Sequence, residues 1–103
     1  GPTAESFMER TNFDLLFLGT NGFDVESGLT TPNEDEARMK ELMVEKAAKV
    51  VLVADLSKLG RRSFVQFASL EEIDLFITDG TLDADSREEI ESAGVTVVDG
   101  VAR

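Results

Sequence analysis

The sequence contains no cysteine and no histidine. Without cysteine the chain can form no disulfide, no thiolate nucleophile and no thiolate metal site, which is compatible with the cytoplasm, where we expect the protein. Without histidine it has no imidazole to act as a general base or to ligate zinc. These absences exclude serine-histidine-aspartate, cysteine-histidine and zinc-hydrolase chemistry, and we expect neither a metal nor a cofactor.

Positive charge and long apolar runs are also scarce. The chain has 10 lysines and arginines against 21 aspartates and glutamates, a formal net charge of -11. Because binding to phosphate backbones depends on released counterions, the chain itself has little means of binding DNA. No apolar run approaches the ~18 residues of a membrane span, so we expect no membrane association. The acidity is typical of a solvated surface, or of a high-salt host in which like charges are screened.

What is present suits a single folded domain. The chain is 103 residues long, 42% apolar and 30% charged, which is the composition of a soluble domain with one modest core. Four short apolar runs recur, at residues 15–18, 50–54, 75–77 and 95–98. They are nearly continuous, as strands are when a parallel sheet is covered on both faces. We therefore predict an α/β fold: a Rossmann-like parallel sheet of about four strands with helices on its faces.

The best-defined crossover helix lies between the first two runs. Residues 31–34 fit a helix start in which Thr31 is the N-cap, Pro32 takes the first helical position and Glu34 closes a capping box. Met39 and Met43 then share one stripe with Ala47, four residues apart. This spacing predicts an amphipathic helix of about fifteen residues resting on the sheet.

Two further helices are expected nearer the ends of the chain. A helix from about residue 83 to 93 would be capped by Asp83 and ended by Gly94, with Ile90 in the core. A helix over residues 3–11 is expected to turn Phe7 and Ala4 inward. Residues 63–68 are ambiguous between a short strand and a helical turn, because periodicity cannot decide so short a segment.

Polar and glycine residues follow the predicted strands, at the sheet edge where ligands of such folds gather. The segment Gly19-Thr20-Asn21-Gly22 could expose backbone N–H groups to a ligand, or it could be an ordinary turn. Lys58 lies in the loop after the second strand, where an ammonium suits a phosphate or carboxylate. The alternative is that Lys58 only pairs with Asp55.

Three motifs go further than spacing: residues 28–31 with Glu36-Ala37, the Asp55-x-Ser57-Lys58 element, and residues 77–79. With the rest of residues 17–61 and 70–79, they resemble the C-terminal sensor domain of DeoR-family transcriptional repressors. The resemblance implies a domain related to ribose-5-phosphate isomerase, glucosamine-6-phosphate deaminase and CoA transferases, which senses a phosphorylated sugar or a related metabolite. Operator DNA would be bound only through an N-terminal winged helix-turn-helix.

The resemblance also implies roles for particular residues. Lys58 matches a basic residue that meets the ligand phosphate in sugar-phosphate relatives, and Gly19, Asn21 and Gly22 match the pocket loop. Deaminase relatives carry Asp-Gly-His where this chain has Asn21, Gly22 and Phe23. Replacing the carboxylate and the imidazole removes both proton carriers, so we expect no catalysis.

Compared with that family, the helix-turn-helix and the first half of the sensor domain are not in the chain. We expect residues 1–103 to be a single partial domain, the C-terminal part of a sugar-phosphate sensor. One sheet face would then be uncovered, which favours self-association. Two alternatives remain open from the sequence: a fragment of a sugar-phosphate isomerase or deaminase, and an oligomerisation domain without a ligand.

Overall fold

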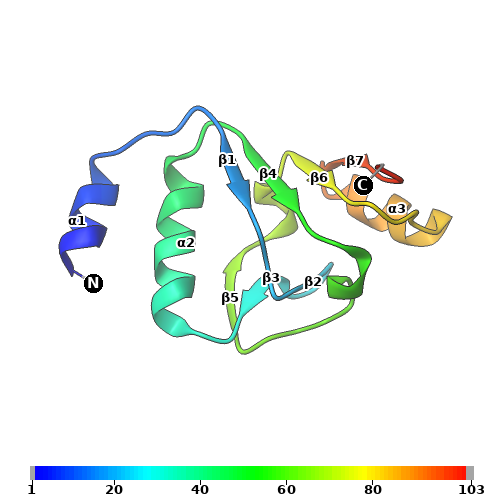
Figure 1. Ribbon diagram of the computed structural model, residues 1–103, viewed down its shortest axis with the longest axis horizontal. Coiled ribbons are helices and arrows are strands. Elements are labelled where there is room, and N and C mark those ends of the chain that lie inside the picture. The colour runs from blue at the N-terminus through cyan, green and yellow to red at the C-terminus, as the bar shows by residue number, and fades with distance from the viewer. Residues whose placement is uncertain (1, 102–103) are drawn as a thin grey trace.

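The computed structural model describes residues 2–101, which form two sheets and three helices (Figure 1). The helices are α1 (Pro2–Glu9), α2 (Glu34–Lys46) and α3 (Ala84–Ser92). The strands are β1 (Leu16–Leu18), β2 (Gly22–Asp24), β3 (Gly28–Thr31), β4 (Val50–Val53), β5 (Val65–Ala68), β6 (Leu75–Ile77) and β7 (Thr96–Val98). Single 3-10 turns occupy Leu56–Lys58 and Leu70–Glu72. Among the described residues no helix is both long enough and apolar enough to cross a membrane.

The four predicted apolar runs form one parallel sheet, in the order β1-β4-β6-β7. Leu18 pairs with Leu52 of β4, which pairs in turn with Phe76 of β6. Each strand therefore ends at the same edge of the sheet, because every pair is parallel and in step. The prediction of an α/β fold with a four-stranded parallel sheet is confirmed.

A second, antiparallel sheet with the order β2-β3-β5 packs beside the first and was not foreseen from the sequence. The ambiguous segment at residues 63–68 provides its strand β5. Gly28 opens β3 with a φ of +65°, and a Cβ there would lie 2.2 Å from the carbonyl oxygen of Ala68. Only glycine combines that dihedral with so close a strand.

The core lies between the two sheets and under α2 and α3. It contains one face of the parallel sheet, including Leu16, Leu52 and Phe76, together with Phe23 of β2 and Ile90 of α3. The rings of Phe23 and Phe76 meet edge to face at 4.9 Å between centroids. This one cluster therefore joins the parallel sheet, the antiparallel sheet and α3 into a single body.

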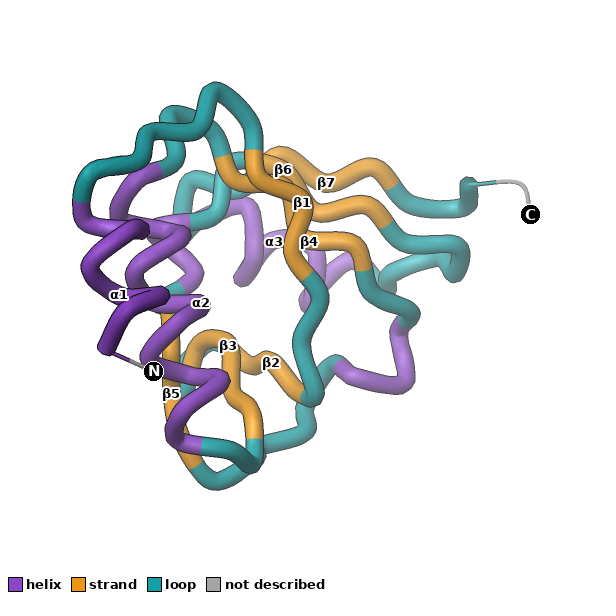
Figure 2. The backbone as a smooth tube through the Cα atoms, turned by 60° about the vertical axis from the view of Figure 1, so that its left-hand side comes forward, coloured by secondary structure: helices purple, strands orange, loops and turns teal. Residues whose placement is uncertain are grey.

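The other face of the parallel sheet, the bare face, carries several exposed apolar side chains among the described residues, although Val51 at its centre is only 3% exposed. Phe17 is 63% exposed, Val53 49% and Val98 42%. The strand register places Phe17 in one row with Val51 and Leu75. Helices α1, α2 and α3 all lie on the side of the sheet away from this face (Figure 2). The nearly continuous apolar runs thus belong to a sheet whose second face is only partly covered by residues 2–101.

Helix α2 begins two residues later than predicted. Its N-cap is Asn33, whose side chain accepts a hydrogen bond of 2.9 Å from the backbone N–H of Glu36. Thr31 cannot be the cap because it still belongs to β3, where it pairs with Val65 and is fully buried. The predicted cap was therefore wrong, and Pro32 precedes the helix instead of opening it.

Helix α3 agrees with the prediction, whereas helix α1 agrees with it only in part. Helix α3 has Asp83 as its N-cap and Ile90 in the core, as expected. Helix α1 forms, but Phe7 is 60% exposed and Ala4 is exposed as well, so the inward packing of both was wrong. The reason is that α1 packs on α2 and not on the sheet.

Carboxylates fix several loops by accepting backbone hydrogen bonds. Asp99 accepts one of 2.9 Å from Leu82 N and also pairs with the guanidinium of Arg87 on α3. Both partners favour the charged form, so they lower the pKa of Asp99 below its ordinary value, the Leu82 N–H most strongly. Ser86 N–H in the same way lowers the pKa of Asp83. The loop before α3 is thus held by ionised groups.

Because these pKa values are lowered in the folded state, their contribution to stability is complete above the ordinary carboxyl pKa, ~4, and is lost as the pH falls through the folded values. Asp99→Asn should lower the melting temperature at pH 7 and reduce its decrease between pH 5 and pH 3, measured by circular dichroism. Asp14→Asn, at an exposed loop position, is the matched control. Equal pH profiles for both variants would contradict this role of Asp99.

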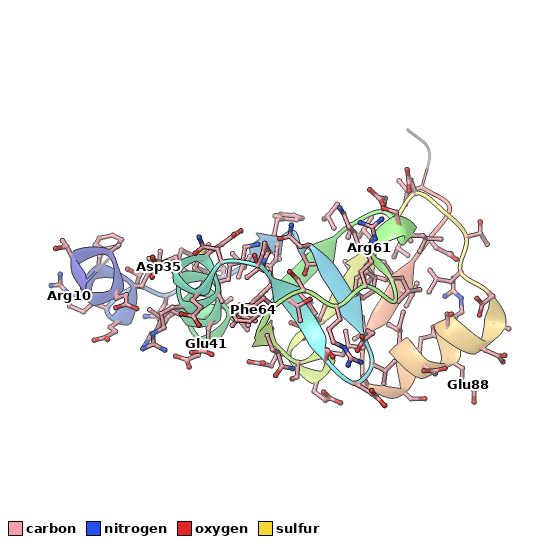
Figure 3. The ribbon with its side chains drawn as sticks, turned by 90° about the horizontal axis from the view of Figure 1, so that it is seen from below. Arg10, Asp35, Glu41, Arg61, Phe64 and Glu88 are labelled. Atoms are coloured by element: carbon pink, nitrogen blue, oxygen red, sulfur yellow. The ribbon has the colours of Figure 1, made fainter. Side chains whose placement is uncertain are left out.

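The net charge of -11 generates a second prediction. Asp35 on α2 and Glu88 on α3 point outward into the surroundings (Figure 3), and both are exposed. Added salt shortens the Debye length from ~10 Å at 0.1 M to ~3 Å at 1 M, which screens the repulsion among such groups. The melting temperature should rise by several degrees as potassium chloride is raised over this range. A decrease would contradict the view that repulsion among acidic groups destabilises the fold.

Candidate functional site

A cleft of about 450 Å³ opens at the edge of the parallel sheet where β1, β4 and β6 end. Its size falls within the range of ~300–1,000 Å³ that is usual for small-molecule sites. The residues that line it are Gly19, Thr20, Val53, Ala54, Asp55, Lys58, Ile77, Thr78, Asp79 and Val101. Val53 and Ile77 also belong to the bare face of the sheet, so the cleft and that face are continuous.

Lys58 reaches the cleft from the 3-10 turn that follows β4. Asp55 caps this turn: its carboxylate accepts a hydrogen bond of 3.0 Å from Ser57 N and also contacts the Ser57 hydroxyl. Within residues 2–101, Lys58 takes part in none of the ion pairs closer than 4.0 Å. The ammonium is therefore presented at the strand end by a turn that Asp55 and Ser57 hold.

The cleft carries charges of both signs. Asp55 and Asp79 line it together with Lys58, from the ends of the neighbouring strands β4 and β6. Both carboxylates have interactions of their own within the structure. With one ammonium beside two carboxylates, the cleft has no positive net charge that would attract anions from a distance. The ammonium can still bind one anionic group, while the carboxylate oxygens accept hydrogen bonds from hydroxyl groups.

Gly19 lines the cleft, and its carbonyl group is held by Lys40, a residue that was not singled out from the sequence. Lys40 of α2 donates a hydrogen bond of 3.3 Å to the Gly19 carbonyl oxygen and pairs at 3.1 Å with Glu36. The Lys40 ammonium also lies 5.0 Å from the centroid of the Phe67 ring. The hydrogen bond from Lys40 is the main cause that lowers the pKa of Glu36, and the Thr31 hydroxyl lowers it further. Because Lys40 and Gly19 are 21 residues apart in sequence, no local pattern signals this link.

Asn21 and Gly22 do not line the cleft. The Thr31 hydroxyl lies 3.1 Å from Asn21 Oδ1 and 3.0 Å from Glu36 Oε2, which ties the loop to β3 and α2. Gly22 opens β2, and a Cβ on it would lie 2.5 Å from the carbonyl oxygen of Arg61. The structure thus brings Lys58 and Gly19 together, and it places Asn21 and Gly22 where they hold the loop.

The cleft also contains residues that were not singled out as site residues from the sequence. Thr78 and Val101 are the clearest examples. Thr78 is a buried polar residue directly after β6. Its place at a strand end follows from the sequence, but its burial does not. Val101 follows β7 and reaches the cleft because its N–H donates to the Thr78 carbonyl oxygen at 3.3 Å. Phe23, which the resemblance to deaminase relatives singled out, lies in the core at 0% exposure.

The chain is similar to known transcriptional regulators. It is 98% identical over all 103 residues to the HTH-type transcriptional regulator GlpR of Haloferax volcanii, of which it covers 40%. Over 95% of its length it is 41% identical to the putative aga operon transcriptional repressor of Escherichia coli O157:H7, covering 36% of that protein. Over 77% of its length it is 32% identical to the glycerol-3-phosphate regulon repressor of Escherichia coli K12, covering 31%.

The chain therefore spans two fifths or less of the length of these relatives. Residues 1–80 match the family described as the DeoR C terminal sensor domain. That match includes β1, β4, β6 and most of the cleft lining, from Gly19 to Asp79. The chain belongs to the DeoR family of transcriptional regulators, of which it is a sensor domain.

Proposed function

We propose that the chain senses a phosphorylated sugar or polyol, which binds at the strand-end cleft. The observation that carries this proposal is Lys58, an ammonium held at the end of β4 within a cleft of suitable size. An ammonium is a common phosphate-binding group at such positions. In a domain that belongs to a family of regulators, a small molecule bound there is an effector.

The mixed charge of the cleft favours this class of ligand over a simple anion. Lys58 can donate hydrogen bonds to a phosphoryl group, and Asp55 and Asp79 can accept hydrogen bonds from hydroxyl groups. A polyanion such as nucleic acid meets two carboxylates in the cleft and a net charge of -11 on the whole chain. The name of the Escherichia coli K12 relative, which refers to glycerol 3-phosphate, supports a small phosphorylated polyol. Fructose 1-phosphate and deoxyribose phosphate fit the same chemistry.

We infer that this domain carries out no reaction on its ligand. The position that bears a histidine in deaminase relatives is Phe23, which packs in the core against Phe76. Asn21 carries an amide in place of a carboxylate and contacts Thr31, outside the cleft. An amide and a phenyl ring cannot exchange protons with a substrate. The curated relatives reported above are regulators, which supports a sensing role.

We propose that operator DNA is bound by another part of a longer protein, since the relatives are more than twice as long as this chain. Residues 1–103 would then be the C-terminal part of the sensor domain. Binding of the effector would favour one arrangement of subunits over another and change how paired DNA-binding domains reach their sites. The ligand can shift that balance only by its difference in affinity for the two arrangements.

The bare sheet face supports self-association of the chain as it stands. Phe17, Val53 and Val98 are exposed apolar side chains on this face, and Leu75 and Ile77 between them are partly exposed. Parallel sheets are nearly always covered on both faces, because their backbone and apolar side chains are otherwise wetted. A second copy offers the same apolar surface, and pairing of the two would remove both from water.

The ligand proposal predicts a specific loss on removal of the Lys58 charge. In amide NMR titrations of this 11.2 kDa chain, glycerol 3-phosphate or fructose 1-phosphate should shift residues around the cleft. Lys58→Gln should weaken this binding by about tenfold or more, since hydrogen bonds to charged groups contribute ~1.5–3 kcal/mol. Lys49→Gln, which removes an exposed lysine outside the cleft, should bind as the unmodified chain does. No response to any phosphorylated sugar, or an unchanged affinity in Lys58→Gln, would refute the proposal.

The self-association proposal predicts a concentration-dependent dimer in sedimentation velocity. Phe17→Ser should shift the chain towards the monomer, because it removes the most exposed side chain of the bare face. Phe64→Ser is the matched control, since Phe64 is 78% exposed but precedes β5 of the other sheet (Figure 3). A monomer at every concentration, or equal effects of the two variants, would show that the bare face does not pair with a second copy.

A further inference from the structure

Thr78 carries a buried hydroxyl that lacks a partner within residues 2–101. The residue is only 3% exposed, and its Oγ1 is shielded from water without a hydrogen bond. Its backbone groups are both satisfied: the N–H donates to Val98 O at 3.0 Å, and the carbonyl accepts from Val101 N at 3.3 Å. Only the side-chain hydroxyl of Thr78 therefore lacks a hydrogen-bond partner within the described residues.

The other two buried threonines show that this deficit is unusual here. Thr30 Oγ1 accepts a hydrogen bond of 2.8 Å from Ser63 N and lies 3.2 Å from the Gly22 carbonyl oxygen. Thr31 Oγ1 contacts Asn21 and Glu36. Buried hydroxyls are normally paired because leaving one unpaired costs free energy. Valine has almost the same shape and would avoid that cost, so a threonine at this position calls for a partner.

The position of Thr78 points to a ligand as that partner. Thr78 follows β6 directly and lines the same cleft as Lys58, which comes from the end of the neighbouring strand β4. A hydroxyl both donates and accepts, whereas the ammonium only donates and an ionised carboxylate only accepts. Thr78 therefore adds to the cleft a group that can pair with either a hydroxyl or a carbonyl oxygen.

We propose that the Thr78 hydroxyl is a ligand-binding group that pairs with a hydroxyl or carbonyl of the sugar part of the effector, while Lys58 holds the phosphoryl group. This inference rests on the proposed sensing function and deepens it. Rotation about χ1 moves the hydroxyl between staggered positions. Since Oγ1 has no hydrogen bond to lose within the described residues, turning towards a ligand breaks none. The site thus exchanges an unpaired hydroxyl for a paired one when the effector binds.

The experiment compares Thr78→Val, Thr78→Ser and Thr30→Val by thermal melting and by NMR titration of this chain. Thr78→Val should melt at the same temperature as the unmodified chain or higher, because it removes an unpaired buried hydroxyl. Thr30→Val should melt at a lower temperature, because its hydroxyl is paired. A melting temperature of Thr78→Val as low as that of Thr30→Val would show that the hydroxyl already has a partner, and would overturn the inference.

The titration separates the two halves of the ligand. Thr78→Val should bind glycerol 3-phosphate about tenfold more weakly than the unmodified chain but bind inorganic phosphate equally, whereas Lys58→Gln should lose affinity for both. Thr78→Ser should keep its affinity for glycerol 3-phosphate, because it keeps the hydroxyl. Equal affinity of Thr78→Val and the unmodified chain would overturn the role of Thr78 and leave the sensing function standing. Absence of binding to the unmodified chain would overturn both.

Discussion

Parallel, in-step pairing of β1, β4 and β6 is the constraint on which the rest of the molecule depends. Because the three strands end together, the loops that follow them converge on one edge, and the cleft forms there without any long insertion. The same pairing divides the side chains into two sets. One set, which includes Leu52 and Phe76, packs against the antiparallel sheet and the helices. The other set, which includes Phe17, is left bare.

The cleft brings together groups that could orient a small molecule: the Lys58 ammonium, the carboxylates of Asp55 and Asp79, and Thr78. The chain has no histidine, the side chain whose ordinary pKa lies nearest neutral pH. Phe23 lies in the core instead, where it contacts Phe76. If the cleft binds an effector without acting on it, as we propose, the binding energy is available for changing a conformational equilibrium.

Sequence patterns predicted the parts of this fold that local physics determines. The four parallel strands follow from their apolar runs, and α3 follows from its cap at Asp83. The strands of the antiparallel sheet are as short as the parallel ones, but their sequences, GFD, GLTT and VQFA, contain glycine or polar residues and form no continuous apolar run, so they were missed. The cap of α2 was misplaced because Thr31 and Asn33 are both good caps, and the pairing of Thr31 with distant Val65 decides between them.

The candidate site, like the fold, could be predicted from the sequence only in part. The strand-end rule located Lys58 and Gly19 correctly in the cleft, since it needs only the order of strands and loops. It could not show that Asn21 and Gly22 turn to structural contacts with Thr31 and Arg61, because those contacts are formed across the fold. The contact of Lys40 with Gly19 O is likewise set by where α2 lies. Tertiary contacts thus decide which residues of a loop line the cleft.

Val53 and Ile77 are shared by the bare face and the wall of the cleft. A molecule or segment that packs on the face therefore touches side chains that also line the cleft. Thermodynamic reciprocity then requires that, if covering the face changes the effector's affinity by some factor, the effector changes the strength of that covering by the same factor. If the cleft binds an effector as we propose, these two shared side chains would link assembly to metabolite level.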